Sequence, residues 1–135
     1  EYLSKHKNVA RVIYPTKYNG EIGKRAKKYL KGGYGGLVGI ELKGGIEAGK
    51  KFIEALKMFY HVANIGDARS LAIHPGSTTH SQLNEKELLA AGVTPGYVRL
   101  AIGIEHIDDI IEDLEQALNR ASDNIENIKK AKAVG

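Results

Sequence analysis

Apolar and polar residues alternate along this chain with two different periods, which predicts a mixture of strands and helices. A period of two, typical of a strand with one buried face, recurs in four short segments, at 9–14, 37–42, 59–63 and 97–102. A period near 3.6, typical of an amphipathic helix, marks residues 21–30, 46–58, 84–92 and 107–120. Residues 2–6 read as the end of a further helix, and the Ser-, Thr- and Gly-rich segment 70–82 as a loop.

The helix expected after Asn84 carries the clearest local signals. Asn84 is a favourable N-cap, Glu87 stands three residues later as a capping box requires, and Gly92 is a favourable C-terminal residue. Leu83 and Leu88 have the spacing of a hydrophobic staple. These features predict a short helix with well-defined ends.

Strands and helices follow one another without an internal repeat and without the long crossovers that parallel strands require. The predicted fold class is therefore α+β, with a small, mostly antiparallel sheet and helices packed on one of its faces. The length of 135 residues corresponds to a single domain, and the 42% of hydrophobic residues suffices for a core.

Composition and charge exclude several function classes. The absence of Cys excludes disulfide scaffolds and thiolate chemistry, and no apolar run is long enough to span a membrane. We expect a cytoplasmic protein. The net charge of +4 conceals +8 over residues 1–60 and −4 over the rest. The densest basic segment, 23–31, has no accompanying nucleic-acid motif, so we interpret it as a solvated helix face with Ala26, Tyr29 and Leu30 turned inward.

The sequence gives little support to two further candidate sites, a phosphate-binding loop and a metal site. Residues 44–51 (GGIEAGKK) resemble a phosphate-binding P-loop, but Lys51 stands where magnesium binding needs Ser or Thr, and the segment is predicted to be helical. The histidines show no metal-ligand spacing, so we expect no metal site, a structural hydrogen bond for His74 and a helix-terminus contact for His106.

Arg99 is the more informative residue. In the strand 97–102, Val98, Leu100 and Ile102 share the face expected to pack on helices, so Arg99 points to the other face. A guanidinium held on a sheet is a good bidentate receptor for a carboxylate, although an isolated strand arginine is more often a surface ion pair.

Three segments together resemble the Cys/Met-metabolism family of enzymes that use pyridoxal phosphate. They are 43–50 (KGGIEAGK), 70–83 (SLAIHPGSTTHSQL) and 98–109 (VRLAIGIEHIDD), in the order that the family has them. The segments 64–70 (NIGDARS) and 78–83 (TTHSQL) look most like O-acetylhomoserine sulfhydrylases. Asn64 departs from the Ser that is commoner in the family, above all in its lyase branches, and Gly76 stands where Ala is usual.

The resemblance implies a domain assignment and a set of site residues. Residues 1–135 would be the C-terminal small domain of a fold-type I enzyme, with the cofactor-binding lysine in a large domain upstream and no catalytic residue in this chain. Arg99 would receive the substrate carboxylate with help from Asn64. The loop through Ser70 and Thr79 would line the cofactor side of the site.

For the complete enzyme, the resemblance implies replacement of acetate on an O-acetylhomoserine-type amino acid by sulfide or a thiol, which is a step of methionine biosynthesis. The cofactor would be pyridoxal 5'-phosphate, and the assembly a homodimer or homotetramer, with no nucleic-acid or membrane partner. Two alternatives stay open: a methionine or cystathionine γ-lyase or γ-synthase of the same family, and a non-catalytic domain that binds a small molecule.

Overall fold

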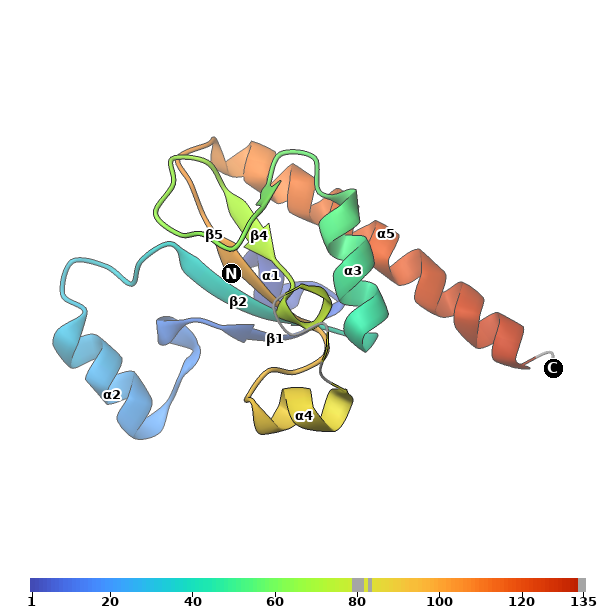
Figure 1. Ribbon diagram of the computed structural model, residues 1–135. Helices are drawn as coiled ribbons and strands as arrows, with labels where there is room; N and C mark the ends of the chain where they lie inside the picture. Colours follow the sequence, from blue (N-terminus) through green and yellow to red (C-terminus); the bar gives the residue numbers. More distant parts are fainter. Residues whose placement is uncertain (79–81, 83, 134–135) are drawn as a thin grey trace.

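The computed structural model describes residues 1–78, 82 and 84–133, and a five-stranded sheet forms its centre (Figure 1). The strands lie in the order β1-β2-β5-β4-β3. Their bounds are Val9–Ile13 (β1), Leu37–Leu42 (β2), Tyr60–His61 (β3), Leu71–Ile73 (β4) and Tyr97–Ala101 (β5). All neighbouring strands are antiparallel except β3 and β4, which are parallel. The predicted α+β class and mostly antiparallel sheet are confirmed.

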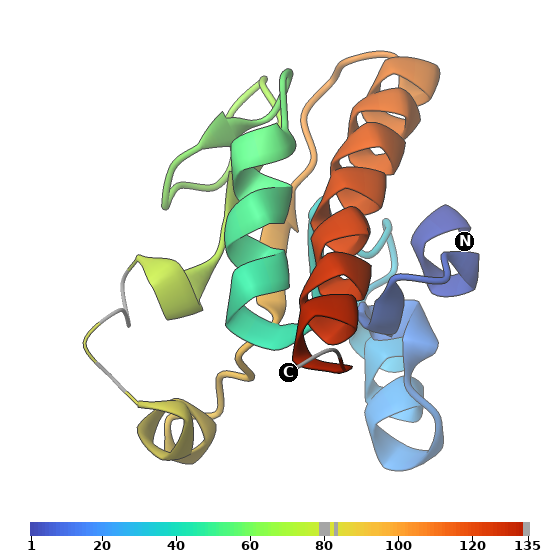
Figure 2. The ribbon, with the colours of Figure 1, turned by 90° about the vertical axis from the view of Figure 1, so that its right-hand side faces the viewer.

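Two long helices lie side by side across one face of this sheet, as Figure 2 shows. They are α3 (Gly45–Ala55) and α5 (Ile107–Ala133), and the shorter helices are α1 (Tyr2–Lys5), α2 (Gly20–Tyr29) and α4 (Glu85–Ala90). Two short 3-10 helices, η1 (Pro15–Lys17) and η2 (Pro75–Ser77), complete the described elements. The core forms where the two helices meet the sheet, around the fully buried Ile40, Phe52, Val98, Leu100 and Leu118. None of the described helices is long and apolar enough to cross a membrane.

Asp113 on α5 links this helix to the backbone segment that follows α3. Its carboxylate, on α5, accepts hydrogen bonds from the N–H groups of Lys57, Met58 and Phe59, at 2.9, 2.9 and 3.2 Å. These groups follow the end of α3 directly, so α3 ends at Ala55 rather than near residue 58 as the periodicity predicted. The side chain of Asp113 is buried, and the hydrogen bonds from these three N–H groups, with a fourth from Gln116 Nε2 at 3.0 Å, compensate for the loss of water.

Local helix signals were read correctly, whereas some boundaries were not. The Asn84 side chain accepts from the N–H groups of Lys86 and Glu87, and the Glu87 side chain accepts from Asn84 N–H, which confirms the capping box. Gly92 follows α4 with a positive φ of 76°, as expected. The predicted hydrophobic staple involves Leu83, which lies outside the described residues. The last helix continues to Ala133 rather than ending at Arg120.

The interpretation of residues 70–82 as a loop was wrong, since they contain β4 and η2. The strand was hidden because Leu71, Ala72 and Ile73 are all buried, so the polar–apolar alternation that marks a half-exposed strand is missing. The predicted strand at 59–63 is reduced to Tyr60–His61.

The basic helix α2 stands away from the sheet, as the lower left of Figure 1 shows. Its lysines are exposed, as predicted, and Lys24 pairs with Glu21 at 2.8 Å. The prediction of an inward apolar face was wrong, because Tyr29 and Leu30 are exposed and Ala26 is only half-buried. This helix buries only Gly23, on the backbone of Tyr18.

Candidate functional site

Arg99 lies in the middle of β5, between the fully buried Val98 and Leu100, and points to the other face of the sheet as alternation predicted. The arginine side chain is half-buried, and its Nη2 donates to the backbone oxygen of Asn64 at 3.1 Å. Its Nε is buried and has no hydrogen-bond partner among the described residues. Because a buried donor without a partner costs free energy, Nε is suited to an acceptor that arrives with a ligand.

A groove of about 320 Å³ lies beside this guanidinium. Gly39 on β2 is opposite Arg99 in the ladder, and a Cβ atom there would lie 2.8 Å from Cε2 of Tyr97, so the tyrosine ring covers the backbone at Gly39. The remaining lining residues are Ile13, Tyr14, Pro15, Tyr18, Leu37 and Val38. Burial raises the pKa of the Tyr97 hydroxyl, although the positive charge of Arg99 acts in the opposite direction. Arg99 therefore supplies the positive charge of a groove that is otherwise apolar or aromatic.

Asn64, the second predicted binding residue, contacts Arg99 through its backbone. Its carbonyl oxygen accepts the bond from Arg99 Nη2, while its side-chain Oδ1 accepts from the N–H of Ile65 at 2.9 Å. The residue is exposed. An amide whose oxygen is engaged in this way still has its NH₂ group to offer, which is the correct polarity for a carboxylate. The structure thus brings Asn64 and Arg99 together, through the backbone carbonyl of Asn64, and their shared role in binding a carboxylate stays a prediction.

Ser70 is fully buried, and its polar atoms are engaged within the protein. Glu105 accepts from Ser70 N–H at 2.7 Å and from the Ser70 hydroxyl at 2.8 Å, while the N–H of Gly103 donates to the same hydroxyl at 2.9 Å. Partial burial raises the pKa of the Glu105 carboxyl, but the hydrogen bonds from Ser70 and from its own backbone outweigh this effect, so the pKa lies below its usual range. Thr79 lies outside the described residues, and its role stays a prediction.

Sequence reasoning did not single out Glu105. It lies 35 residues from Ser70, between the end of β5 and the start of α5, where an isolated acid has no local signal. Gly103 could have pointed to a close approach: a Cβ atom there would lie 2.6 Å from Glu105 Oε2 and would overlap the carbonyl of Ala68.

His74 has the structural role that we expected and makes one more hydrogen bond than predicted. Its imidazole is fully buried, with Nε2 2.8 Å from the carbonyl oxygen of Pro95 and Nδ1 2.8 Å from the Ser77 hydroxyl. Since a carbonyl only accepts, Nε2 carries the proton and Nδ1 accepts from Ser77. Burial lowers the pKa of His74, so the ring is neutral at pH 7.

The P-loop-like run has the structure of an ordinary helix. Gly49 and Lys50 lie inside α3, as predicted, and Lys50 pairs with Glu47 at 3.0 Å.

His106 accepts from the N–H of Asp108 at 3.3 Å, which confirms its contact at the start of α5. Within the described residues no group of three or more His, Asp and Glu side chains is arranged to hold a metal ion.

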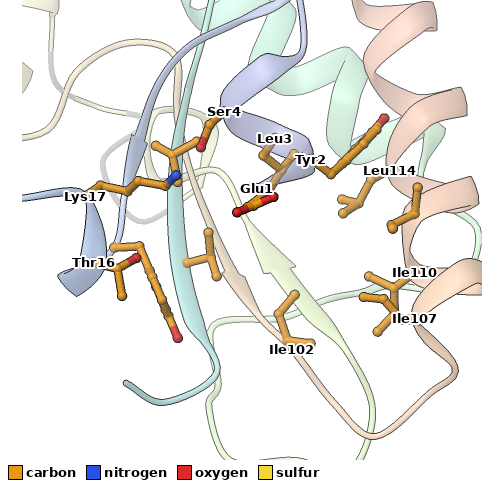
Figure 3. A pocket seen from close by; sticks show the side chains of 14 residues that line it. Glu1, Tyr2, Leu3, Ser4, Thr16, Lys17, Ile102, Ile107, Ile110 and Leu114 are labelled. Carbon is orange, nitrogen blue, oxygen red and sulfur yellow. The ribbon is translucent and has the colours of Figure 1, made fainter. Parts of the chain in front are cut away.

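A larger hollow, of about 670 Å³, lies between α1, β1 and α5 (Figure 3). Its walls are mainly aliphatic, with Leu3, Ile102, Ile107, Ile110 and Leu114 among the labelled residues. Neither Arg99 nor Asn64 lines it, so its size does not make it the site of polar chemistry.

The described lysines do not fit the attachment of a carbonyl cofactor, whereas the groove beside Arg99 fits an anionic group. A lysine that carries a carbonyl cofactor has to be enclosed, yet the lysines whose exposure is described are exposed, apart from the half-buried Lys51. The Nε of Arg99, by contrast, is a donor without a partner among the described residues, and a guanidinium is suited to an anion such as a carboxylate. The fold and this site define the chain as an α+β domain that carries an arginine-containing groove on one face of its sheet.

Comparison with known families identifies the family of the chain. The profile described as Cys/Met metabolism PLP-dependent enzyme matches residues 1–119, and the chain belongs to that family. The resemblance seen in the sequence is therefore confirmed, and the family's cofactor is pyridoxal phosphate.

Similar proteins include sulfhydrylases, a homocysteine synthase and methionine gamma-lyases. The chain is 55% identical to the O-acetyl-L-homoserine sulfhydrylase of Leptospira meyeri, over 87% of the chain and 27% of that protein. It is 49% identical to the homocysteine synthase of Schizosaccharomyces pombe, over 90% of the chain and 28% of that protein. It is 43% identical to an L-methionine gamma-lyase of Fusobacterium nucleatum, over 89% of the chain and 30% of that protein. The chain thus spans a little over a quarter of the length of these relatives.

A solved structure shares the fold. The crystal structure of a Campylobacter jejuni protein with a proposed O-acetylhomoserine (thiol)-lyase activity superposes with a TM-score of 0.77 at 41% identity. The match covers 87% of this chain and 28% of that one, and that protein contains N'-pyridoxyl-lysine-5'-monophosphate.

Proposed function

We propose that this chain is the small domain of an O-acetylhomoserine sulfhydrylase-like enzyme, with residues 1–135 forming one wall of an active site whose cofactor is held by another part of the protein. The observation that carries the proposal is the buried, unpartnered Nε of Arg99 beside an Nη2 already fixed on Asn64. The sulfhydrylase and homocysteine synthase relatives support the choice of reaction.

Arg99 binds and orients the substrate. With Nη2 held by the carbonyl of Asn64, Nε–H and the remaining N–H groups form a fork that matches the two oxygens of an α-carboxylate. The NH₂ group of Asn64 can donate to the same carboxylate. Fixing the carboxylate fixes the position of the substrate's Cα, Cβ and Cγ atoms relative to the rest of the site, which lowers the entropic cost of reaction.

Pyridoxal phosphate, when bound, supplies the electron sink that allows protons to leave Cα and Cβ. The overall reaction then replaces acetate at Cγ by sulfide or a thiol. No side chain of this domain needs to transfer a proton in this scheme. We assign Thr79 to the cofactor side of the wall. Ser70, predicted for the same side, is fully buried and bonded to Glu105, so we assign it to the support of the loop instead. We expect the complete enzyme to be a cytoplasmic homodimer or homotetramer.

The test is the variant Arg99→Ala in the complete enzyme. It should lower kcat/KM for the amino-acid substrate and leave the absorption spectrum of the bound cofactor unchanged, because in this proposal the arginine contacts the substrate and not the cofactor. Normal kinetics would overturn the assignment of the site.

The second candidate is a γ-lyase, which the identity to the Fusobacterium L-methionine gamma-lyase favours. Product analysis separates the two reactions. A sulfhydrylase given O-acetylhomoserine and sulfide releases homocysteine and acetate, whereas a γ-lyase given methionine releases methanethiol, ammonia and an oxo acid.

A further inference from the structure

The loop whose Asn64 carbonyl binds the Arg99 side chain is held by hydrogen bonds at its C-terminal end. It connects β3 to β4 and carries Asn64, whose carbonyl accepts from Arg99 Nη2. Within the loop, Asp67 accepts from the N–H of Arg69 at 3.0 Å. At Ala68 and Ser70 the loop meets the segment that continues β5 beyond Ala101. The same strand therefore carries the arginine and leads into the residues that restrain the loop.

Four hydrogen bonds join the two segments. Ser70 N–H and its hydroxyl donate to the two oxygens of Glu105, Gly103 N–H donates to the Ser70 hydroxyl at 2.9 Å, and Ile104 N–H donates to Ala68 O at 2.9 Å. Two of the four end on a carboxylate, which makes them the stronger pair. Glu105 is thus the charged centre of the contact.

The close approach of these segments depends on Gly103, because any side chain there would meet Glu105 and the carbonyl of Ala68. Ser70 is fully buried and can use its hydroxyl as both donor and acceptor only in this arrangement. The contact is therefore specific in geometry as well as in charge.

We propose that Glu105 is a positioning residue for the substrate-binding arginine: by holding Ser70 it fixes the loop whose Asn64 carbonyl orients the Arg99 guanidinium. The inference rests on the proposed carboxylate-binding role of Arg99. It predicts that loss of the Glu105 charge weakens substrate binding although Glu105 does not touch the substrate.

The variant Glu105→Gln in the complete holoenzyme tests the proposal. It keeps the size of the side chain but replaces one acceptor oxygen by a donor that faces Ser70. KM for the amino-acid substrate should rise about tenfold, in line with the loss of one charge-assisted hydrogen bond. The value of kcat should stay within about twofold, since the positioned group binds rather than reacts. Glu112→Gln, an exposed acid on α5, is the matched control and should change neither constant.

A double-mutant cycle separates positioning from general structural support. In an Arg99→Ala background, Glu105→Gln should raise KM by less than about twofold, because its effect passes through the arginine. An undiminished tenfold increase there would overturn the positioning role while leaving the role of Arg99 intact. So would a lowered melting temperature with an unchanged KM. If Arg99→Ala alone left KM unchanged, the proposed function and this inference would both be wrong.

Ser70→Ala provides a second test, and it serves alone if Glu105→Gln does not fold. It removes the hydroxyl that links Glu105 to Gly103 and keeps the backbone hydrogen bond. KM should rise by about threefold, and the increase should again vanish in the Arg99→Ala background. An unchanged KM in a folded Ser70→Ala enzyme would contradict the proposal.

Discussion

Gly49 of α3 and His74 lie so close together that a Cβ atom on the glycine would be 2.5 Å from Cδ2 and 2.6 Å from Cε1 of the imidazole. The histidine ring is fully buried and held by Pro95 and Ser77 on opposite sides, so it cannot move aside. This contact couples the helix face to the segment that follows β4.

Gly49→Ala should therefore destabilise the domain by about 1–3 kcal/mol, because the added methyl group overpacks a site with no free volume. Urea denaturation followed by circular dichroism gives the free energy of unfolding. Gly32→Ala is the control, since a Cβ atom there meets nothing within 4 Å. Equal stability of the two variants would show that the imidazole can move.

Stability should fall as the pH is lowered from 7 to 5, because His74 is buried in its neutral form. Burial places its folded-state pKa below the ordinary value of 6.5, so the unfolded chain binds the proton more readily. The stabilisation is present above pH 6.5 and is lost as the pH falls toward the folded-state pKa. Free energies of unfolding measured across this range should show the slope, and His74→Gln should reduce it. A slope unchanged by His74→Gln would assign it to other groups.

Asp113→Ala should be among the most damaging single changes, at about 2–4 kcal/mol, because the N–H groups of Lys57, Met58 and Phe59 lose their acceptor in a region with little access to water. Glu112→Ala, at the exposed neighbouring position, should stay within about 0.5 kcal/mol of the parent. The melting temperatures of both variants, measured by thermal unfolding, test this difference in stability. Similar melting temperatures would mean that water replaces the carboxylate.

Arg99→Lys in the complete enzyme should restore only part of the activity that Arg99→Ala removes. The alanine variant should lose about 2–4 kcal/mol of transition-state binding, or about 30- to 1000-fold in kcat/KM. An ammonium group cannot make the paired hydrogen bonds of a guanidinium, so kcat/KM of the lysine variant should lie between those of the parent enzyme and the alanine variant. Melting temperatures should change little, since the residue's bond to Asn64 is a single one near the surface. Unchanged kinetics with a lower melting temperature would assign Arg99 a structural role.

The isolated chain should neither attach pyridoxal phosphate nor turn over an amino acid, since none of its lysines lies in a motif resembling the family's cofactor lysine. Borohydride treatment after incubation with the cofactor, followed by peptide mass spectrometry, is the direct measurement. A single, specifically pyridoxylated lysine accompanied by turnover would contradict this prediction.

Features that depend on neighbours in the sequence were predictable. The capping box at Asn84 and Glu87 involves residues three apart, and the direction of Arg99 follows from alternation along one strand. The family was recognisable for the same reason, because its motifs are continuous segments.

Tertiary structure alone decided the features that join distant segments. Glu105 accepts a hydrogen bond from Ser70, 35 residues away in the sequence, and Asp113 accepts one from Lys57, 56 residues away. The close contact with His74 leaves no room for a side chain at Gly49. The strand at Leu71–Ile73 is buried on both faces and so has no periodic signal, whereas α2 is periodic and yet exposes Tyr29 and Leu30. The physical reason is the same in each case: a local pattern specifies backbone conformation and the direction of side chains, but burial and hydrogen-bond partners depend on which segments meet when the chain folds.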